Sequence, residues 1–160
     1  MKKLLLVTTL LLASTSVYAD FYKGYSKDDV RCLATNIYFE SRNQSKSGKV
    51  AVGLVTVNRT NAPNWPNTIC GVVTQAKLWE GNPIRNKCQF SWYCDGLSDS
   101  IRDIAAWEDA VLRSYDAIDL DEISADFTDG ATHYHTVHVS PWWQDKYEFI
   151  VRIDDHKFYK

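Results

Sequence analysis

Apolar side chains recur at helical spacing in a segment that begins at Ser26. The stripe that they form contains Val30, Leu33 and Ile37. The next position on this stripe is occupied by a carboxylate, Glu40. Ser26 and Asp29 have the spacing of a capping box, so we expect the helix to begin at Ser26. The pattern therefore predicts an amphipathic helix with a carboxylate on its apolar face.

Two further long helices are predicted, with a short helix between them in the sequence. Residues 49–59 are apolar on two faces, which is typical of a central buried helix. Residues 67–75 are expected to form the short helix. The third long helix is expected to start at Ser98 or Asp99 and to end at Ile118. Its apolar stripe contains Ile101, Ile104, Ala105, Val111, Leu112 and Tyr115.

Beyond the helices the hydrophobic period changes to that of strands. Residues 131–139 alternate between apolar and polar, and residues 148–153 and 156–159 flank a two-residue turn. These segments predict a small antiparallel sheet. Residues 78–97 are rich in Gly, Asn, Pro, Trp and Cys and are expected to form a long, ordered, functional loop. The predicted architecture is α+β, a single domain with helices packed around a small antiparallel sheet.

The first 19 residues have the features of a secretory signal peptide. The chain starts with two lysines, continues with an apolar run at residues 4–12, and reaches small residues at 17–19. We expect cleavage before Asp20, with residues 20–160 forming one domain of an exported protein, periplasmic or secreted. An uncleaved anchor is the alternative. No other segment is long and apolar enough to span a bilayer, so no stable membrane insertion is expected after cleavage.

Charge and cysteine content agree with an exported single domain. Removing the two signal lysines changes the formal charge from −2 to −4. This balance gives no reason to expect nucleic acid as a partner, and we expect a monomer. Four cysteines in an exported chain indicate two disulfides, for which three pairings exist. We favour Cys88–Cys94 as a local loop and Cys32–Cys70 as a tie between helices; a zinc cluster is the alternative, although the paired Cys-x-x-Cys spacing is missing.

Glu40 is the first candidate for catalysis. A carboxylate on the buried face of a helix costs free energy unless it is paired or protonated. A carboxylic acid that stays protonated near neutral pH is the general acid that cleavage of a glycosidic bond requires. The alternative is a structural ion pair between Glu40 and Arg42 or Arg59.

The histidines offer a second possibility, since all four lie in the predicted sheet region. His133 and His135 project from the same face of a strand and could hold a metal in a zinc-dependent amidase or peptidase. No histidine precedes His133, so a third ligand would have to be Asp, Glu or Cys. We favour ordinary hydrogen-bonding histidines near a cleft, and therefore expect no metal and no cofactor.

Aromatic residues are dense, with six Trp and nine Tyr in the chain. Aromatic faces stack on the apolar faces of sugar rings, so an aromatic groove suits a glycan, whereas the alternative is an aromatic core. Trp92 and Tyr134 lie close to polar residues and are candidates for both roles. Nucleophilic catalysis has weaker support, because Gly-x-Ser-x-Gly is missing and the cysteines are expected to be oxidised.

Several blocks of sequence are specific in combination. They are Cys32–Arg42, Gly48–Arg59, Pro66–Val73, Cys88–Gly96, Gly130–His135, Pro141–Trp142 and His156–Tyr159. In this order they resemble the SleB-type cell-wall hydrolases, which include the spore-cortex lytic enzymes, and they cover nearly all of the chain after the signal. The family usually reads Glu-Ala-Arg-Gly-Glu, whereas this chain has Glu40-Ser-Arg-Asn-Gln44. The departure that matters is at the second acidic position, which is Gln44 here.

The resemblance implies a lysozyme-like domain that degrades peptidoglycan glycan strands as a lytic transglycosylase, with Glu40 as the catalytic acid. A hydrolytic muramidase, a zinc-dependent peptidoglycan amidase or peptidase, and a non-catalytic glycan-binding module remain alternatives. Asn58 and Arg59 are expected to brace the fold. The candidates for substrate binding are Tyr38, Gln89, Ser91, Trp92, Thr132 and Tyr134.

Overall fold

The computed structural model describes residues 21–160. The predicted signal peptide at residues 1–19 lies outside this range. Within the described range, no helix combines the length and the hydropathy that a membrane span requires.

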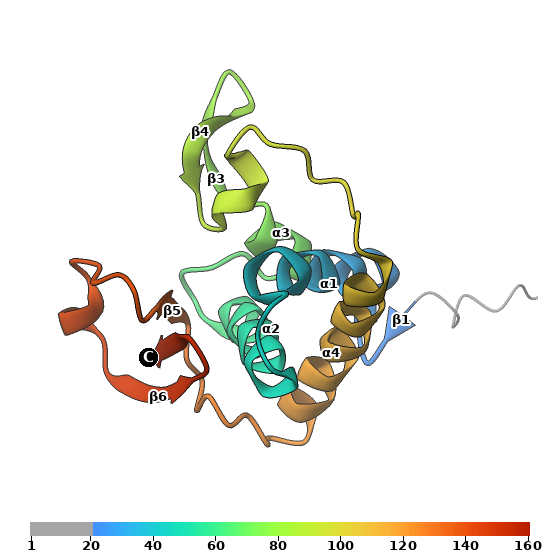
Figure 1. Ribbon diagram of the computed structural model, residues 1–160, viewed down its shortest axis with the longest axis vertical. Coiled ribbons are helices and arrows are strands. Elements are labelled where there is room, and N and C mark those ends of the chain that lie inside the picture. Colours follow the sequence, from blue (N-terminus) through green and yellow to red (C-terminus); the bar gives the residue numbers. More distant parts are fainter. Residues whose placement is uncertain (1–20) are drawn as a thin grey trace, which may run out of the picture.

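Three long helices form the body of the molecule (Figure 1). They are α1 (Lys27–Ser41), α2 (Lys46–Asn61) and α4 (Ile104–Glu122), and the short helix α3 (Ile69–Val73) packs against α1 and α2. Ser26 caps α1 by accepting a hydrogen bond from the Asp29 backbone N–H at 3.1 Å, which confirms the predicted start of this helix. A two-stranded sheet of β1 (Phe21–Tyr22) and β2 (Tyr25–Ser26) precedes it.

Helix α2 is the central element, as the two-faced pattern predicts. One face packs against α1, α3 and α4, and the other packs against the C-terminal sheet. Gly53 lets the helices approach closely, since a Cβ at this position would lie 2.8 Å from the Ala117 side chain and 3.1 Å from that of Ile37. The buried aliphatic residues of α2 are Val50, Ala51, Val52, Leu54, Val55 and Val57.

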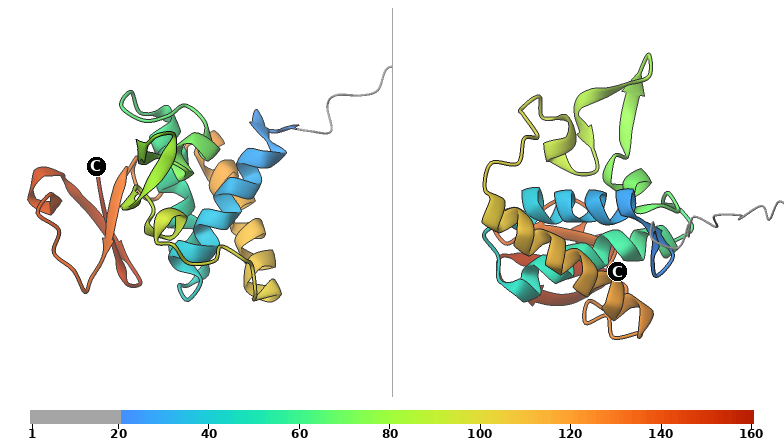
Figure 2. Two further views of the ribbon diagram at one scale, coloured as in Figure 1. Left: turned by 90° about the horizontal axis from the view of Figure 1, so that it is seen from above. Right: turned by 90° about the vertical axis from the view of Figure 1, so that its right-hand side faces the viewer.

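The C-terminal sheet contains three antiparallel strands in the order β5-β7-β6. These are β5 (His133–Thr136), β6 (Phe149–Ile153) and β7 (His156–Tyr159), with the short 3-10 helix η3 (Gln144–Lys146) before β6. The sheet lies on one side of the helices (Figure 2), and buried Phe158 packs against α2. This arrangement confirms the predicted α+β fold and leaves β5 as an edge strand.

The prediction of an irregular loop at residues 78–97 is wrong for the first half of that segment. The structure has a hairpin of β3 (Ala76–Trp79) and β4 (Asn82–Cys88), followed by the 3-10 helix η2 (Ser91–Cys94). Both faces of the hairpin are exposed, so the sequence shows no alternation of apolar and polar residues. Glu80 and Gly81 both have positive φ, as a two-residue hairpin turn requires, but Glu-Gly is a weak signal for such a turn.

The predicted start and apolar stripe of the last helix are also wrong. Helix α4 begins only after Asp103, whose side chain accepts a hydrogen bond from the Ala106 N–H at 3.0 Å. Ile104 is 61% exposed and Leu112 is 56% exposed. The residues that α4 buries are Ala110, Ser114, Ala117 and Ile118. Because three of these four residues are small, a count of large apolar side chains places the stripe on the wrong side of the helix.

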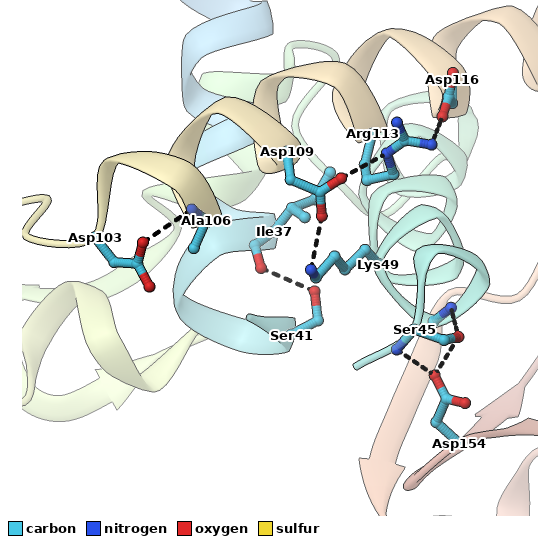
Figure 3. A network of polar contacts seen from close by, with 11 residues as sticks. Ile37, Ser41, Ser45, Lys49, Asp103, Ala106, Asp109, Arg113, Asp116 and Asp154 are labelled. Atoms are coloured by element: carbon cyan, nitrogen blue, oxygen red, sulfur yellow. Dashed lines mark hydrogen bonds and ion pairs between the residues drawn. The ribbon is translucent and has the colours of Figure 1, made fainter. Parts of the chain in front are cut away.

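Polar contacts fix the start of α2 (Figure 3). Lys49 forms a salt bridge with Asp109 of α4 at 2.7 Å, and Asp109 also contacts Arg113 at 3.3 Å. At the start of α2, the side chain of Asp154 accepts hydrogen bonds from the Ser45 backbone N–H at 2.9 Å and from the Ser45 hydroxyl at 2.6 Å. The last contact ties the turn between β6 and β7 to the helical layer.

Both favoured disulfides are present. Cys32–Cys70 joins α1 to α3 across 38 residues of sequence, and Cys88–Cys94 joins β4 to η2 across 6 residues. The first therefore crosslinks the helical core, whereas the second fastens the base of the hairpin.

We expect the two disulfides to differ in their effect on stability, because the loop-closure entropy removed from the unfolded chain grows with loop length. Replacing Cys32 and Cys70 by Ser should lower the free energy of unfolding by about 4 kcal/mol, and replacing Cys88 and Cys94 by about 2 kcal/mol. Chemical denaturation of both double variants measures the difference. A larger loss for the Cys88 and Cys94 variant would contradict this ranking.

Candidate active site

Glu40 lies in the last turn of α1, where the helix reaches the edge strand of the sheet. Its side chain is partly exposed rather than sealed in the core. The Tyr134 hydroxyl of β5 donates a hydrogen bond to Glu40 Oε2 at 2.9 Å. Among the described residues neither Arg42 nor Arg59 forms a salt bridge with Glu40. The structure therefore does not support the structural ion pair.

Opposing influences act on the Glu40 carboxyl group. Burial raises its pKa above the ordinary value, and this effect is the largest. The hydrogen bond from Tyr134 and the positive charge of Arg59 both act in the opposite direction, because they stabilise the carboxylate. The net result is a raised pKa in a group that still reaches solvent, which suits a side chain that must give up a proton and take it back.

Arg59 supplies this charge from a buried position on α2. Its Nε donates a hydrogen bond to the Thr132 carbonyl oxygen at 2.8 Å, and its guanidinium lies over the rings of Trp65 at 4.2 Å and Phe90 at 5.1 Å. Burial lowers the pKa of Arg59 to about 10, so the group remains charged at neutral pH. Nη1 is buried and has no hydrogen-bond partner among the described residues. Arg59 therefore braces the segment that leads into β5, as expected, and also contributes positive charge near Glu40.

A pocket of about 560 Å³ lies at the open edge of β5. Thr132 and His133 line this pocket, and the next residue along the strand, Tyr134, bonds Glu40. Thr132 precedes β5, whereas His133 and Tyr134 are its first two residues and project from opposite faces of the strand. The complete lining is Ala62, Asn64, Trp65, Gln75, Gln89, Thr132, His133, Trp142, Trp143 and Tyr147.

The two histidines of β5 have separate environments. His135 is buried, with Nε2 hydrogen-bonded to the Tyr159 hydroxyl at 2.9 Å and Nδ1 to the Thr136 carbonyl oxygen at 2.8 Å. The His133 ring stacks on Tyr147 with the ring centroids 4.0 Å apart. Within residues 21–160 no group of three or more His, Cys, Asp or Glu side chains could hold a metal ion. His135 has no free nitrogen with which to complete the metal pair considered above.

Only some of the proposed substrate-binding residues lie at the pocket or contact Glu40. It brings Gln89 and Thr132 into the pocket and Tyr134 to Glu40. Trp92 instead stacks on the Phe39 ring and donates a hydrogen bond from Nε1 to the Asn36 side chain at 3.0 Å. Its contacts are those of a core residue.

Two other candidates lie away from Glu40. Tyr38 is buried, and its hydroxyl accepts hydrogen bonds from Arg42 Nη1 at 3.2 Å and from the Asp103 backbone N–H at 3.2 Å. These contacts place Tyr38 in the packing between α1 and the start of α4. Ser91 is exposed at the first position of η2 and does not line the pocket.

Sequence reasoning missed several residues of the pocket. Asn64, Gln75 and Tyr147 carry no motif, and they come together only because a loop, the base of the hairpin and the segment before β6 meet in space. The density of aromatic residues was the available signal, since Trp65, Trp142 and Trp143 all belong to the pocket. The pattern could not show which tryptophans share one wall.

Comparison with known proteins then places the chain in a family. The model of the family described as Cell Wall Hydrolase matches residues 43–159. The chain belongs to the cell wall hydrolase family. The match begins three residues after Glu40, so it covers the pocket and Tyr134 but not the candidate acid.

Solved structures of related hydrolases extend the comparison over α1. The catalytic domain of the germination-specific lytic transglycosylase SleB from Bacillus anthracis is 27% identical, with a TM-score of 0.67 over 88% of this chain and 100% of that domain. The catalytic domain of the Bacillus cereus SleB protein is also 27% identical, with a TM-score of 0.64 over 88% of this chain and 96% of that domain. Both likenesses confirm the lysozyme-like α+β fold class.

Curated relatives match over a shorter segment. The spore cortex-lytic enzyme of Bacillus subtilis (strain 168) is 40% identical over 58 residues, which are 36% of this chain and 19% of that enzyme. That of Bacillus cereus (strain ATCC 14579) is 39% identical over 56 residues, 35% of this chain and 22% of that enzyme. The chain thus matches about a fifth of the length of these relatives.

The raised pKa of Glu40 predicts a link between its protonation and the stability of this cell wall hydrolase. The folded protein binds the proton more tightly than the unfolded chain does, so stability falls as pH rises from the ordinary carboxyl pKa through the raised one. Glu40→Gln should therefore be more stable than the parent at about pH 8, by about 1.4 kcal/mol for each tenfold by which folding tightens proton binding, and should lose this advantage at about pH 3.

Thermal or chemical denaturation across this pH range provides the measurement. Glu80→Gln is the matched control, because Glu80 is exposed at the tip of the hairpin. A Glu40→Gln protein that is no more stable than the parent at the higher pH would show that the carboxylate is not desolvated.

Proposed function

We propose that the protein is a peptidoglycan lytic transglycosylase that cleaves the bond between N-acetylmuramic acid and N-acetylglucosamine. One observation carries the proposal: Glu40 is a partly exposed carboxyl group whose pKa is raised by burial. It accepts a hydrogen bond from Tyr134, whose chain neighbour His133 lines a pocket of aromatic rings and amides. The fold of the SleB catalytic domains, one of which is a lytic transglycosylase, supports the same chemistry.

In the first step Glu40 acts as the general acid. Its protonated carboxyl group donates a proton to the oxygen that links the two sugars. The bond from this oxygen to C1 of the muramic acid breaks, and N-acetylglucosamine leaves with a new hydroxyl group. Positive charge develops on C1 and the ring oxygen of the muramic acid, as in other glycosidic cleavages.

In the second step the same side chain acts as the base. The Glu40 carboxylate removes the proton from the C6 hydroxyl of the muramic acid, and O6 forms a bond to C1. The product is 1,6-anhydro-N-acetylmuramic acid, no water is consumed, and Glu40 is protonated again. One carboxyl group therefore completes the cycle.

Tyr134 and Arg59 would act on Glu40 in the interval between these steps. The Tyr134 hydroxyl is positioned to hold the carboxylate that the first step creates, at a donor–acceptor distance of 2.9 Å. Arg59 lowers the free energy of this carboxylate through its charge, without a salt bridge that would hold it permanently ionised. Both would be positioning residues rather than proton donors.

The surroundings of Glu40 favour transglycosylation over hydrolysis. Hydrolytic muramidases usually use a second carboxylate about 5–9.5 Å from the first, as nucleophile or as base for water. Burial, Tyr134 and Arg59 are the influences on the pKa of Glu40, and no carboxylate of residues 21–160 is among them. Gln44, which replaces the family's second acidic residue, accepts a hydrogen bond from the Asp155 backbone N–H at 3.2 Å and so fastens a turn.

The cellular setting follows from the substrate. Peptidoglycan lies outside the cytoplasm, and residues 1–19 have the pattern of an export signal. We therefore propose a periplasmic or secreted enzyme that acts as a monomer on glycan strands and needs no cofactor.

We expect Glu40→Gln to abolish lysis of purified sacculi while the protein remains folded, since loss of the only acid and base should lower the rate by about a thousandfold or more. Turbidity of the sacculi measures the rate, and circular dichroism checks the fold. Mass spectrometry of the parent digest should find anhydro-muropeptides.

Other products would identify other functions. Muramic acid with a free reducing end would indicate a hydrolytic muramidase. Free peptides, with activity lost to chelators, would indicate an amidase or peptidase, and retention on sacculi without soluble fragments would indicate a binding module. Unimpaired lysis by Glu40→Gln would overturn the assignment of Glu40.

Tyr134→Phe should move the alkaline limb of the pH–rate profile to higher pH. The Tyr134 hydroxyl stabilises the Glu40 carboxylate, so its removal raises the pKa of Glu40 further and keeps the acid protonated to higher pH. We expect kcat to fall by less than in Glu40→Gln.

Tyr22→Phe is the control for this experiment. The Tyr22 hydroxyl also donates to a carboxylate, Asp119 Oδ1 at 2.7 Å, but at the far end of the helical layer. Its removal should leave the profile unchanged. A profile that stays in place in Tyr134→Phe would show that the hydrogen bond does not govern Glu40.

A further inference from the structure

The β3–β4 hairpin projects away from the helices and from the C-terminal sheet (Figure 1). Its base is held by the disulfide between Cys88 and Cys94 and by a hydrogen bond from Arg85 Nε to the Asp95 carbonyl oxygen at 2.9 Å. Residues 77–87 are all exposed, so no other part of the chain within the described range covers them. The hairpin is therefore a projection with a fixed base and an uncovered outer half.

The tip of the hairpin, which comprises residues 78–84, is rich in exposed apolar side chains. Leu78 is 60% exposed, Trp79 is 70% exposed and Ile84 is 36% exposed. Successive side chains of a strand point to opposite faces, so Leu78 and Trp79 lie on different faces of the hairpin. The register places Pro83 on the face of Leu78 and Ile84 on the other face. Both faces of the tip are therefore apolar, and a flat partner surface could cover only one of them.

Cationic side chains accompany this apolar tip. The two strands carry Lys77, Arg85 and Lys87. Glu80 in the turn is the one acidic residue of the hairpin, so three cations and one carboxylate give residues 76–88 a formal charge of +2. None of the three cations forms a salt bridge with another residue of the described range. The full chain has a formal charge of −2, so the hairpin is a cationic element on an acidic protein.

The outer edges of the hairpin are unsuited to pairing with a strand of another molecule. In β4, Pro83 has no N–H to donate, and Asn86 has a positive φ of 58°, which interrupts the extended backbone. In β3, the register shifts between Ala76 and Leu78. Irregularities of this kind keep an edge strand from extending its sheet into a second chain. A partner of the hairpin is therefore expected to bind its side chains rather than its backbone.

We propose that the hairpin tip docks the protein reversibly on the surface of an anionic lipid bilayer. Lipid closes around an inserted group from every side, so it can cover both apolar faces of the tip at once. Trp is favoured in the interfacial layer, and anionic headgroups attract Lys and Arg. The long stems of Lys77 and Lys87 let their ammonium groups stay at the headgroups while the tip lies deeper. This inference goes beyond the proposed function, because it concerns a surface that takes no part in the cleavage of glycan.

The length of the hairpin separates this surface from the pocket near β5. A strand rises about 3.3 Å per residue, so Glu80 in the turn lies about 15 Å beyond Gln75, the pocket residue that directly precedes β3. Apolar side chains at a bilayer interface are buried about 5–10 Å deep. The tip can therefore enter the interface while the pocket remains in water. Docking of this kind would hold the enzyme beside a membrane and leave the pocket open to peptidoglycan.

Sedimentation with lipid vesicles at physiological ionic strength tests the proposal. The protein purified after export should bind vesicles of phosphatidylglycerol and phosphatidylethanolamine, and should bind phosphatidylcholine vesicles about tenfold or more weakly. Lys77→Gln combined with Lys87→Gln should weaken binding to the anionic vesicles by about 25-fold, since each cation near such a surface contributes about fivefold. Leu78→Ser combined with Trp79→Ser should weaken it by about tenfold or more, because two apolar side chains are lost from the interface.

Matched controls remove the same groups from other exposed positions. Lys46→Gln combined with Lys146→Gln removes the same charge outside the hairpin. Trp142→Ser removes a tryptophan that is 79% exposed and does not belong to the hairpin. Both controls should bind the anionic vesicles as the parent does. Every variant carries the same N-terminus, so differences among them report on the substituted positions.

Fluorescence shows whether the tip enters the lipid. Anionic vesicles with brominated acyl chains should quench the tryptophan emission of the parent, and Trp79→Phe should lose most of this quenching while it still binds. The proposal is overturned if the parent does not bind anionic vesicles or binds phosphatidylcholine equally well. It is also overturned if either hairpin double variant binds as the parent does, or if the quenching persists in Trp79→Phe.

These outcomes are independent of the catalytic assignment. Purified sacculi contain no bilayer, so the hairpin double variants should lyse them as the parent does. Anhydro products from the parent without vesicle binding would remove only the docking surface. Vesicle binding without soluble products from sacculi would remove only the catalysis. A tip variant that loses retention on sacculi but still binds vesicles would assign the tip to the wall and overturn the lipid proposal.

Discussion

The hydrogen bond between Tyr134 and Glu40 is the contact on which the site depends. It joins the last turn of α1 to the edge strand of the sheet. The two bonded residues are 94 positions apart in sequence. Its length of 2.9 Å requires that the helix and the strand be held at a fixed separation. Helix α2 provides this separation, because it packs against α1 on one face and against the sheet on the other. The site is therefore assembled by packing on both sides of one buried helix.

Two glycines make this packing possible. At Gly53 a Cβ would meet Ala117 and Ile37, so a larger residue would push α2 away from α4 and α1. At Gly48 a Cβ would lie 2.4 Å from Asp154 Oδ2, the oxygen that accepts the hydrogen bonds of Ser45. A side chain at Gly48 would thus displace the Asp154 carboxylate, whose hydrogen bonds with Ser45 tie the sheet to α2.

Local sequence signals predicted the elements whose causes are local. The Ser26 cap, the two-faced pattern of α2, the alternation at residues 131–139 and the final two-residue turn were sufficient for their elements. The hairpin was not predicted, because its two exposed faces give no alternation. Glu40 could be singled out because it interrupts an apolar stripe. Gln75 could not, since its importance arises only where the base of the hairpin meets β5 and the segment around Trp143.

The electrostatics of Glu40 follow from a balance that no single neighbour sets. Burial alone would hold the carboxyl group protonated, and it could then donate a proton but would not readily recover one as a base. A salt bridge with Arg59 would have the opposite effect and would keep the group ionised. The structure avoids both extremes, because Arg59 is bonded to the Thr132 carbonyl and lies against Trp65, so it acts on Glu40 through its charge without direct contact. A side chain that serves in turn as acid and as base needs this intermediate condition, since each of its two steps depends on the free energy difference between its protonation states.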